Sequence, residues 1–364
     1  MRAFTHWIDQ RFADQLAYRV RWQIAFEVGL RQAELLGLTW NCINLATRTI
    51  NMSTIGDDLL RQTSPSFGPK VEAVVVYNSN PVAVAPDSAK VAQGFGREDL
   101  FTVVLEHFLT DTADHADYVL PATTQLEHWD AHTAYGHTCA MLNKPAIAPV
   151  GQARSNARIF RDLALRMGFT DPCFADSDET LARGAFVPEQ VSADALERKG
   201  WSKLQIADAP FAEGGFPTPS GKVWADHPTL GVPDHLPNYE SVRSSPALAA
   251  RFPLAMISPP ARNFLNSTFV NVQSLRASDP EPRLELHPDD AAPRGIKSGV
   301  TVRVFNDRGE YLCKADVSER ARPGVVNGLG IWWRKLGLNG CNVNQLTHQR
   351  LTDIGRAPSF YDCL

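Results

Sequence analysis

The segment VEAVVVY, residues 71–77, decides the fold, because it is a nearly continuous apolar run bounded by polar residues. A second run of this kind, LFTVVLE, occupies residues 100–106, and a third, DYVLP, covers residues 117–121. Short runs of consecutive apolar residues are typical of strands that are covered on both faces of a parallel sheet. Connections of helical length between such runs indicate βαβ units. The sequence therefore predicts an α/β fold with an open, Rossmann-like parallel sheet.

The loops after the predicted strands are the first place to look for a ligand site. In open α/β sheets, ligands bind beyond the carboxyl ends of the strands. We therefore expect these loops to share one rim of the sheet. They are NSNP at 78–81, EHFLTDT at 106–112 and ATTQLEH at 122–128.

The chain outside the predicted sheet divides into three further parts. Residues 1–50 have apolar residues at helical spacing, so we expect a short helical appendage before a sheet domain that spans 51–170. Residues 171–250 contain many prolines and glycines, which indicate an irregular excursion and linker. Residues 251–364 contain short alternating runs separated by turns, which favour a compact β-barrel.

The composition is that of an ordinary globular protein, with 44% of 364 residues hydrophobic and 21% charged. A net charge of −4 provides no broad attraction for nucleic acid or anionic membranes. The six cysteines never form Cys-x-x-Cys, so their spacing indicates neither a zinc ribbon nor an iron–sulfur cluster. Because the first residues lack the apolar run of a signal peptide and no long apolar stretch follows, we expect a cytoplasmic protein that crosses no membrane.

Residues 29–50, GLRQAELLGLTWNCINLATRTI, resemble the opening of the catalytic domain of tyrosine recombinases of the phage-integrase type. In that family the arginine of Gly-Leu-Arg contacts the scissile phosphate. Arg31 matches it, with Glu34 in the accompanying Glu-Leu. The family also needs a His-x-x-Arg pair and a late tyrosine nucleophile, but no histidine here is followed three residues later by arginine. We therefore interpret Arg31 as a solvated charge on a helical remnant, and keep DNA binding or recombination as the alternative.

The rest of the chain, residues 51–364, resembles the carboxyl-terminal part of molybdopterin-dependent oxidoreductases of the dimethyl-sulfoxide-reductase superfamily. Five segments carry the resemblance in the same order. It implies a Rossmann-like domain followed by a molybdopterin dinucleotide-binding β-barrel of the double-psi type, with molybdopterin guanine dinucleotide as the cofactor. The segments are VVVYNSNPVAVAPDSAKV (74–91), TDTADHADYVLPATTQLEHWD (110–130), PTPSGKVWADH (217–227), LELHPDDAAPRGIKSGVTVRVFNDRGE (284–310) and VNQLTHQRLTDIGRAPSFYDCL (343–364).

The resemblance also implies which residues contact the cofactor. That ligand combines a pyrophosphate, a guanine and a flat polar pterin, so short amides, hydroxyls and backbone N–H groups suit it. The implied contacts of the sheet domain are Asn80, Glu106, His107, His128 and Asn156. Those of the barrel are Ser258, Asn266, Ser267, Trp333, Asn344 and Tyr361.

Some of these residues also have simpler interpretations. Asn80 precedes a proline and could terminate its strand as an Asx turn. Glu106 could be a solvent-exposed strand end. Asn344, within VNQLT, has no obvious turn or capping role, which favours cofactor contact.

Three histidines after the third predicted strand raise the alternative of a zinc site. Their spacing has no standard zinc geometry, so we expect no metal ligands there and assign no catalytic residue. The three are His128, His132 and His137.

In the resembled family two molybdopterin guanine dinucleotides hold molybdenum, usually with one protein ligand from an earlier part of the chain. An iron–sulfur cluster, where present, lies earlier still. Neither segment has a counterpart here, and the two resemblances meet near Ile50 and Asn51. We therefore interpret the chain as a chimeric, truncated oxidoreductase fragment that keeps cofactor-binding elements, has no iron–sulfur cluster and is inactive alone. The alternative is a non-catalytic half that pairs with a separate amino-terminal or electron-transfer subunit.

Overall fold

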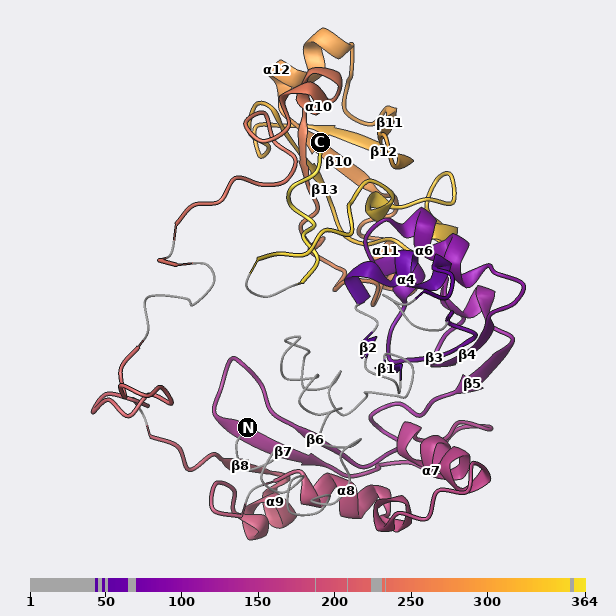
Figure 1. Ribbon diagram of the computed structural model, residues 1–364, viewed down its shortest axis with the longest axis vertical. Coiled ribbons are helices and arrows are strands. Elements are labelled where there is room, and N and C mark those ends of the chain that lie inside the picture. The colour runs from indigo at the N-terminus through magenta and orange to yellow at the C-terminus, as the bar shows by residue number, and fades with distance from the viewer. Residues whose placement is uncertain are drawn as a thin grey trace. The chain divides into compact units, whose positions relative to one another are not determined.

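The computed structural model groups the chain into two compact units by its internal contacts. We call Pro121–Leu236 the excursion unit. The described residues up to Leu120, together with Pro237–Leu364, form what we call the main unit (Figure 1). The described residues are 43–44, 48–49, 52–64, 70–186, 188–207, 209–223, 231–232, 234–353 and 357–364.

The expected helical appendage, residues 1–50, lies almost entirely outside the described residues. Arg31 and Glu34 are among the residues not described. Two short strands are described in this segment, β1 (Ile43–Asn44) and β2 (Arg48–Thr49), which pair with each other in antiparallel fashion.

The main unit contains the parallel sheet that the apolar runs predict. Strand β3 (Ala73–Tyr77) pairs in parallel with β4 (Phe101–Glu106), with Val75 opposite Val103. Strand β5 (Tyr118–Pro121) lies on the other side of β4. The helices α4 (Ile55–Leu60), α5 (Pro81–Val84) and α6 (Ser88–Phe95) accompany this sheet.

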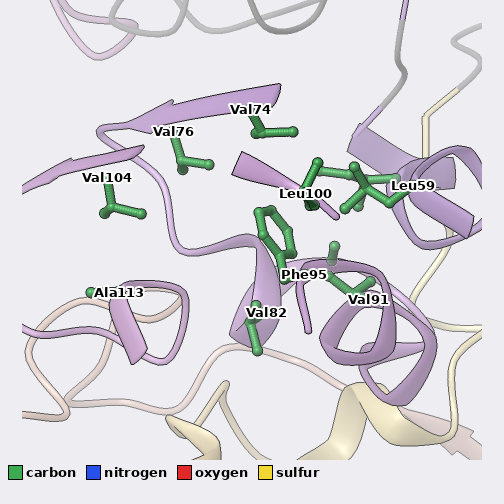
Figure 2. Packing of buried hydrophobic residues seen from close by; sticks show 11 residues of the cluster. Leu59, Val74, Val76, Val82, Val91, Phe95, Leu100, Val104 and Ala113 are labelled. Carbon is green, nitrogen blue, oxygen red and sulfur yellow. The ribbon is translucent and has the colours of Figure 1, made fainter. Parts of the chain in front are cut away.

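A hydrophobic core joins these helices to the sheet. Val74 and Val76 of β3 and Val104 of β4 are buried, whereas the residues between Val74 and Val76 and on either side are more exposed. Phe95 of α6 and Leu59 of α4 pack with them in one cluster (Figure 2). Full burial of side chains of this size stabilises the fold by about 1.5–3 kcal/mol each. The core therefore fixes the position of the loops that leave β3 and β4.

The carboxyl-terminal part of the main unit is a curled five-stranded sheet in the order β11-β12-β10-β13-β9. The pairs β10–β12 and β13–β9 are parallel, and β10–β13 and β11–β12 are antiparallel. The curled sheet and the parallel sheet together confirm the predicted α/β class. The strands are β9 (Ala255–Ile257), β10 (Arg283–Leu286), β11 (Thr301–Asn306), β12 (Gly309–Val317) and β13 (Val325–Gly328).

The excursion unit has its own antiparallel sheet, with β7 (Cys139–Asn143) between β6 (Asp130–His132) and β8 (Trp201–Lys203). Helices α8 (Asp178–Gly184) and α9 (Ala193–Lys199) lie along one side of this sheet in Figure 1. The buried residues of this unit form a separate core, so the unit has an apolar interior of its own. They include Ala140, Leu142, Ala182, Val191 and Leu196.

The remaining elements are short helices and turns that connect these parts. No helix in the described part of the chain is long and apolar enough to cross a membrane. The connecting helices are η2 (Met52–Thr54), η3 (Ala113–His115), α7 (Asn156–Arg166), η4 (Pro172–Ala175), α10 (Pro246–Arg251), α11 (Gln273–Arg276), α12 (Pro288–Ala291), η5 (Ala292–Arg294), η6 (Arg334–Leu336) and η7 (Val343–Gln345).

Candidate functional site

Asn80 ends the loop that follows β3, and its side chain is only 4% exposed. Its Oδ1 accepts hydrogen bonds from the backbone N–H of Thr112 at 3.1 Å and from the Thr112 hydroxyl at 2.8 Å. The side chain makes no capping bond to α5, which begins at Pro81. Its Nδ2 has no hydrogen-bond partner among the described residues. Because an unsatisfied buried amide costs about 1–3 kcal/mol, this donor is suited to an acceptor on a ligand.

Glu106 and His107 lie where β4 ends, at the same rim of the sheet. The Glu106 Oε1 accepts a hydrogen bond from the backbone N–H of His107 at 2.7 Å. Burial raises the pKa of the Glu106 carboxyl, although the bond from His107 and the charge of His107 act in the opposite direction. His107 is exposed, and its ring meets Phe108 edge-on with centroids 6.5 Å apart. The rim therefore carries one half-buried carboxyl and one accessible imidazole.

The predicted contacts of the barrel lie on loops, and hydrogen bonds connect these loops two by two. The indole Nε1 of the buried Trp333 donates to the carbonyl of Ser267 at 2.7 Å. The neighbouring Asn266 adopts a left-handed backbone conformation, with φ of 49°. The hydroxyl of Ser258 donates at 3.2 Å to the carbonyl that precedes Tyr361. Tyr361 is 53% exposed, so its ring is accessible to a ligand.

Asn344 is fully buried, at 0% exposure, so its side-chain amide needs partners inside the protein. Its Nδ2 donates to the carbonyls of Ala83 at 3.1 Å and Val84 at 3.0 Å. Asn342 donates to the same Ala83 carbonyl at 3.0 Å. The two asparagines therefore fasten η7 and its N-cap to α5, and Asn344 has a structural role that its sequence context did not indicate.

His128 and Asn156, the other two predicted contacts, belong to the excursion unit. The His128 Nδ1 lies 2.8 Å from the hydroxyl of Thr123, and its Nε2 lies 3.9 Å from Asp130 Oδ2. Asn156 is the first residue of α7, after the N-cap Ser155, whose hydroxyl accepts from a backbone N–H of the first turn. Within the described ranges, no three His, Cys, Asp or Glu side chains gather closely enough to hold a metal ion.

Asp111 and Thr112 are two residues of the rim that sequence reasoning missed as individual contributors. Asp111 is 4% exposed and accepts hydrogen bonds from the backbone N–H groups of Arg334 at 2.6 Å and Lys335 at 3.2 Å. Burial raises the pKa of the Asp111 carboxyl, against the effect of these two bonds and of the Lys335 charge. The only available signal was their place in the TDTADHA segment, because Arg334 is 223 positions further along the chain.

Comparisons with known proteins agree with this architecture. Residues 28–166 match the family described as Molybdopterin oxidoreductase, and residues 254–364 match the Molydopterin dinucleotide binding domain. The first match begins at residue 28 and therefore includes the whole segment, residues 29–50, that resembles tyrosine recombinases. The recombinase interpretation therefore has no support, and the family resemblance begins before the boundary expected near Ile50.

Two curated relatives and one solved structure illustrate the extent of the similarity. The chain is 38% identical over 323 residues to the probable oxidoreductase YoaE of Bacillus subtilis, which covers 86% of this chain and 46% of that protein. It is 31% identical over 279 residues to a putative dimethyl sulfoxide reductase catalytic subunit of Halobacterium salinarum, covering 73% of this chain and 33% of that protein. Acetylene hydratase from Pelobacter acetylenicus has the same fold, with a TM-score of 0.70, 21% identity, and coverage of 87% of this chain and 46% of that chain.

These comparisons also show how much of each relative's length the chain covers. It spans about half the length of the curated relatives YoaE and YyaE of Bacillus subtilis. The two matched domains follow each other in the order that the parallel sheet and the curled sheet have in the main unit. The chain therefore carries two regions that match domains of molybdopterin oxidoreductases.

Proposed function

We propose that the main unit binds a molybdopterin guanine dinucleotide at the rim of its parallel sheet and the adjoining barrel loops, as part of a molybdopterin oxidoreductase. The observation that carries the proposal is the Asn80 amide, whose buried Nδ2 has no partner among the described residues. A guanine dinucleotide presents many acceptors, on its pyrophosphate and on its base, for such a donor. The residues present therefore fit the cofactor that the family uses.

We propose that the predicted contacts bind different parts of this ligand. The half-buried Glu106 suits the donor edge of a guanine, and its raised pKa reflects a site that disfavours an unpaired negative charge. Trp333 and Tyr361 offer flat surfaces, although only Tyr361 is substantially exposed. When bound, the cofactor would supply the molybdenum centre at which redox chemistry takes place. His107, Ser258, Asn266 and Ser267 complete the proposed set in the main unit, and Asn344 acts through its contacts with α5. His128 and Asn156 belong to the excursion unit, so their contact with the cofactor stays a prediction from the sequence.

We also propose that redox turnover needs residues from outside this chain. In the resembled family the protein ligand to molybdenum precedes the segment matched here, and the chain covers only 46% of its relative YoaE. We therefore expect the chain alone to retain a dinucleotide but not to turn over. The partner would be a polypeptide that corresponds to the remaining part of the relatives.

The test is to express the chain in a bacterial host that makes the cofactor and to analyse the purified protein. Pterin is measured by fluorescence after oxidation, guanine nucleotide by chromatography after acid hydrolysis, and molybdenum by mass spectrometry. We expect equimolar pterin and guanine in the wild-type chain. An Asn80→Leu variant should retain roughly tenfold less, the effect of one lost hydrogen bond to a ligand.

A matched control is Thr102→Val, because Thr102 lies in the same sheet, is fully buried and has a hydroxyl without a hydrogen-bond partner among the described residues. This variant should keep the wild-type pterin content. A wild-type chain that contains neither pterin nor guanine would refute the binding proposal. Stoichiometric molybdenum with turnover in the isolated chain would refute only the proposal that outside residues are needed.

A further inference from the structure

Thr112 is the link between the loop after β4 and the loop after β3. It is fully buried, and its hydroxyl donates to Asn80 Oδ1 at 2.8 Å while it accepts from the backbone N–H of Val82 at 3.1 Å. The backbone N–H of Thr112 donates to the same Asn80 oxygen at 3.1 Å. With Oδ1 held by two donors, the orientation of the Asn80 amide is fixed and its Nδ2 points away from Thr112.

Asp111, the preceding residue, links the same loop to the barrel. Its two carboxylate oxygens accept from the N–H groups of Arg334 and Lys335 at 2.6 Å and 3.2 Å. The Lys335 ammonium in turn donates hydrogen bonds to two carbonyls of the loop that contains Asp111, those of Leu109 at 2.6 Å and Thr110 at 3.2 Å. These bonds hold the turn that directly follows Trp333.

We propose that Asp111 and Thr112 are positioning residues for the dinucleotide site: Thr112 orients Asn80, and Asp111 holds the Trp333 turn against the same loop. This inference rests on the proposed function, because Asn80 and Trp333 are proposed cofactor contacts. Two neighbouring residues thus connect three segments that are far apart in the sequence. Neither residue needs to touch the cofactor, since each acts through a side chain or turn that does.

The experiment compares Thr112→Val, Thr112→Ser and Asp111→Asn in the full chain. Valine keeps the shape of threonine but removes the hydroxyl, and serine keeps the hydroxyl. Two readouts are used: hydrogen–deuterium exchange of the peptides that contain residues 79–84 and 333–336, and the pterin and guanine content. The matched controls are Thr102→Val, whose hydroxyl has no partner among the described residues, and Asp99→Asn, which alters an exposed carboxylate that pairs with Arg97 and not with the Trp333 turn.

For Thr112→Val we expect faster exchange in residues 79–84 and a roughly tenfold lower pterin content, with recovery of both in Thr112→Ser. For Asp111→Asn we expect faster exchange in residues 333–336 and a similar loss of pterin. Unchanged exchange in the β10–β12 strands verifies that each variant is folded. If the variants keep the wild-type pterin content, the positioning roles are refuted while the proposed function stands. A wild-type chain without pterin refutes the proposed function itself, so the two failures are distinguishable.

Discussion

Replacing Asn344 with leucine tests whether this residue supports the structure or contacts the cofactor directly. Leucine has the same number and branching of side-chain heavy atoms as asparagine but no polar atoms. The Asn344 amide donates to the carbonyls of Ala83 and Val84, and both bonds would be lost. The sequence context favoured cofactor contact, whereas complete burial favours a structural role.

The expected magnitude follows from the partners that remain. The Ala83 carbonyl keeps its bond from Asn342, so losing Asn344 there costs about 1 kcal/mol. The Val84 carbonyl loses its Asn344 donor, which costs about 1–3 kcal/mol. Removing the Asn344 Oδ1, which has no partner among the described residues, offsets about 1 kcal/mol. The free energy of unfolding of the main unit should therefore fall by about 1–3 kcal/mol.

The assay is hydrogen–deuterium exchange in a urea series on the ligand-free chain, followed at strands β10 and β12. A global melt would mix the two compact units, whereas exchange reports each segment separately. Asn339→Leu is the control, because Asn339 is exposed and its side chain accepts one bond, from Leu312 N–H at 3.2 Å. A loss below about 0.5 kcal/mol for Asn344→Leu, combined with loss of bound pterin, would refute the structural role.

Three further predictions follow from buried groups of the main unit. Burial alone would raise the pKa of Glu240, but bonds from Arg308 and the Leu364 N–H and the charges of Arg308 and His348 lower it overall. The ionised Glu240 carboxylate therefore stabilises the fold above the unfolded carboxyl pKa of about 4.3, and this contribution is lost as the pH falls through the folded pKa. In urea titrations at decreasing pH, the difference in the free energy of unfolding between the wild type and Glu240→Gln should therefore shrink. Gly330→Ala should lower the free energy of unfolding by about 1–3 kcal/mol, because Gly330 has φ of 71° and a Cβ there would lie 2.8 Å from Ala261 Cβ; an unchanged urea midpoint would contradict this. Burial raises the pKa of Cys313 and Cys363 to about 12, so iodoacetamide near neutral pH should label them only after unfolding, and native labelling seen by mass spectrometry would contradict their burial.

The parallel sheet could be predicted from the sequence because its signal is local. VEAVVVY and LFTVVLE became β3 and β4, paired in parallel with each other, as their apolar runs indicated. Asn80 was placed correctly in the loop after β3, and Glu106 at the end of β4, for the same reason. The alternating runs after residue 251 likewise became the strands of the curled sheet.

The sequence did not reveal the structural roles of Asn80 and Asn344, because those roles depend on contacts with residues far along the chain. The Asx-turn interpretation of Asn80 was wrong, since its Oδ1 accepts from Thr112, which is 32 positions away. Asn344 was singled out because no local role was visible. Its bonds to α5, 260 and 261 positions away, supply the role that local reasoning could not find.

Asp111 and Thr112 show where the limit of sequence reasoning lies. An aspartate and a threonine in a loop most often satisfy nearby backbone groups, and nothing in TDTADHA distinguishes that case from this one. What distinguishes them is that both are nearly fully buried, so their oxygens must find partners inside the protein. The partners available at that depth are Asn80, Val82 and the turn after Trp333, which come from opposite ends of the main unit's sequence. A loop that must satisfy buried oxygens in this way holds both sides of the proposed cofactor site together, and that is why its substitutions should affect the binding of a ligand it does not touch.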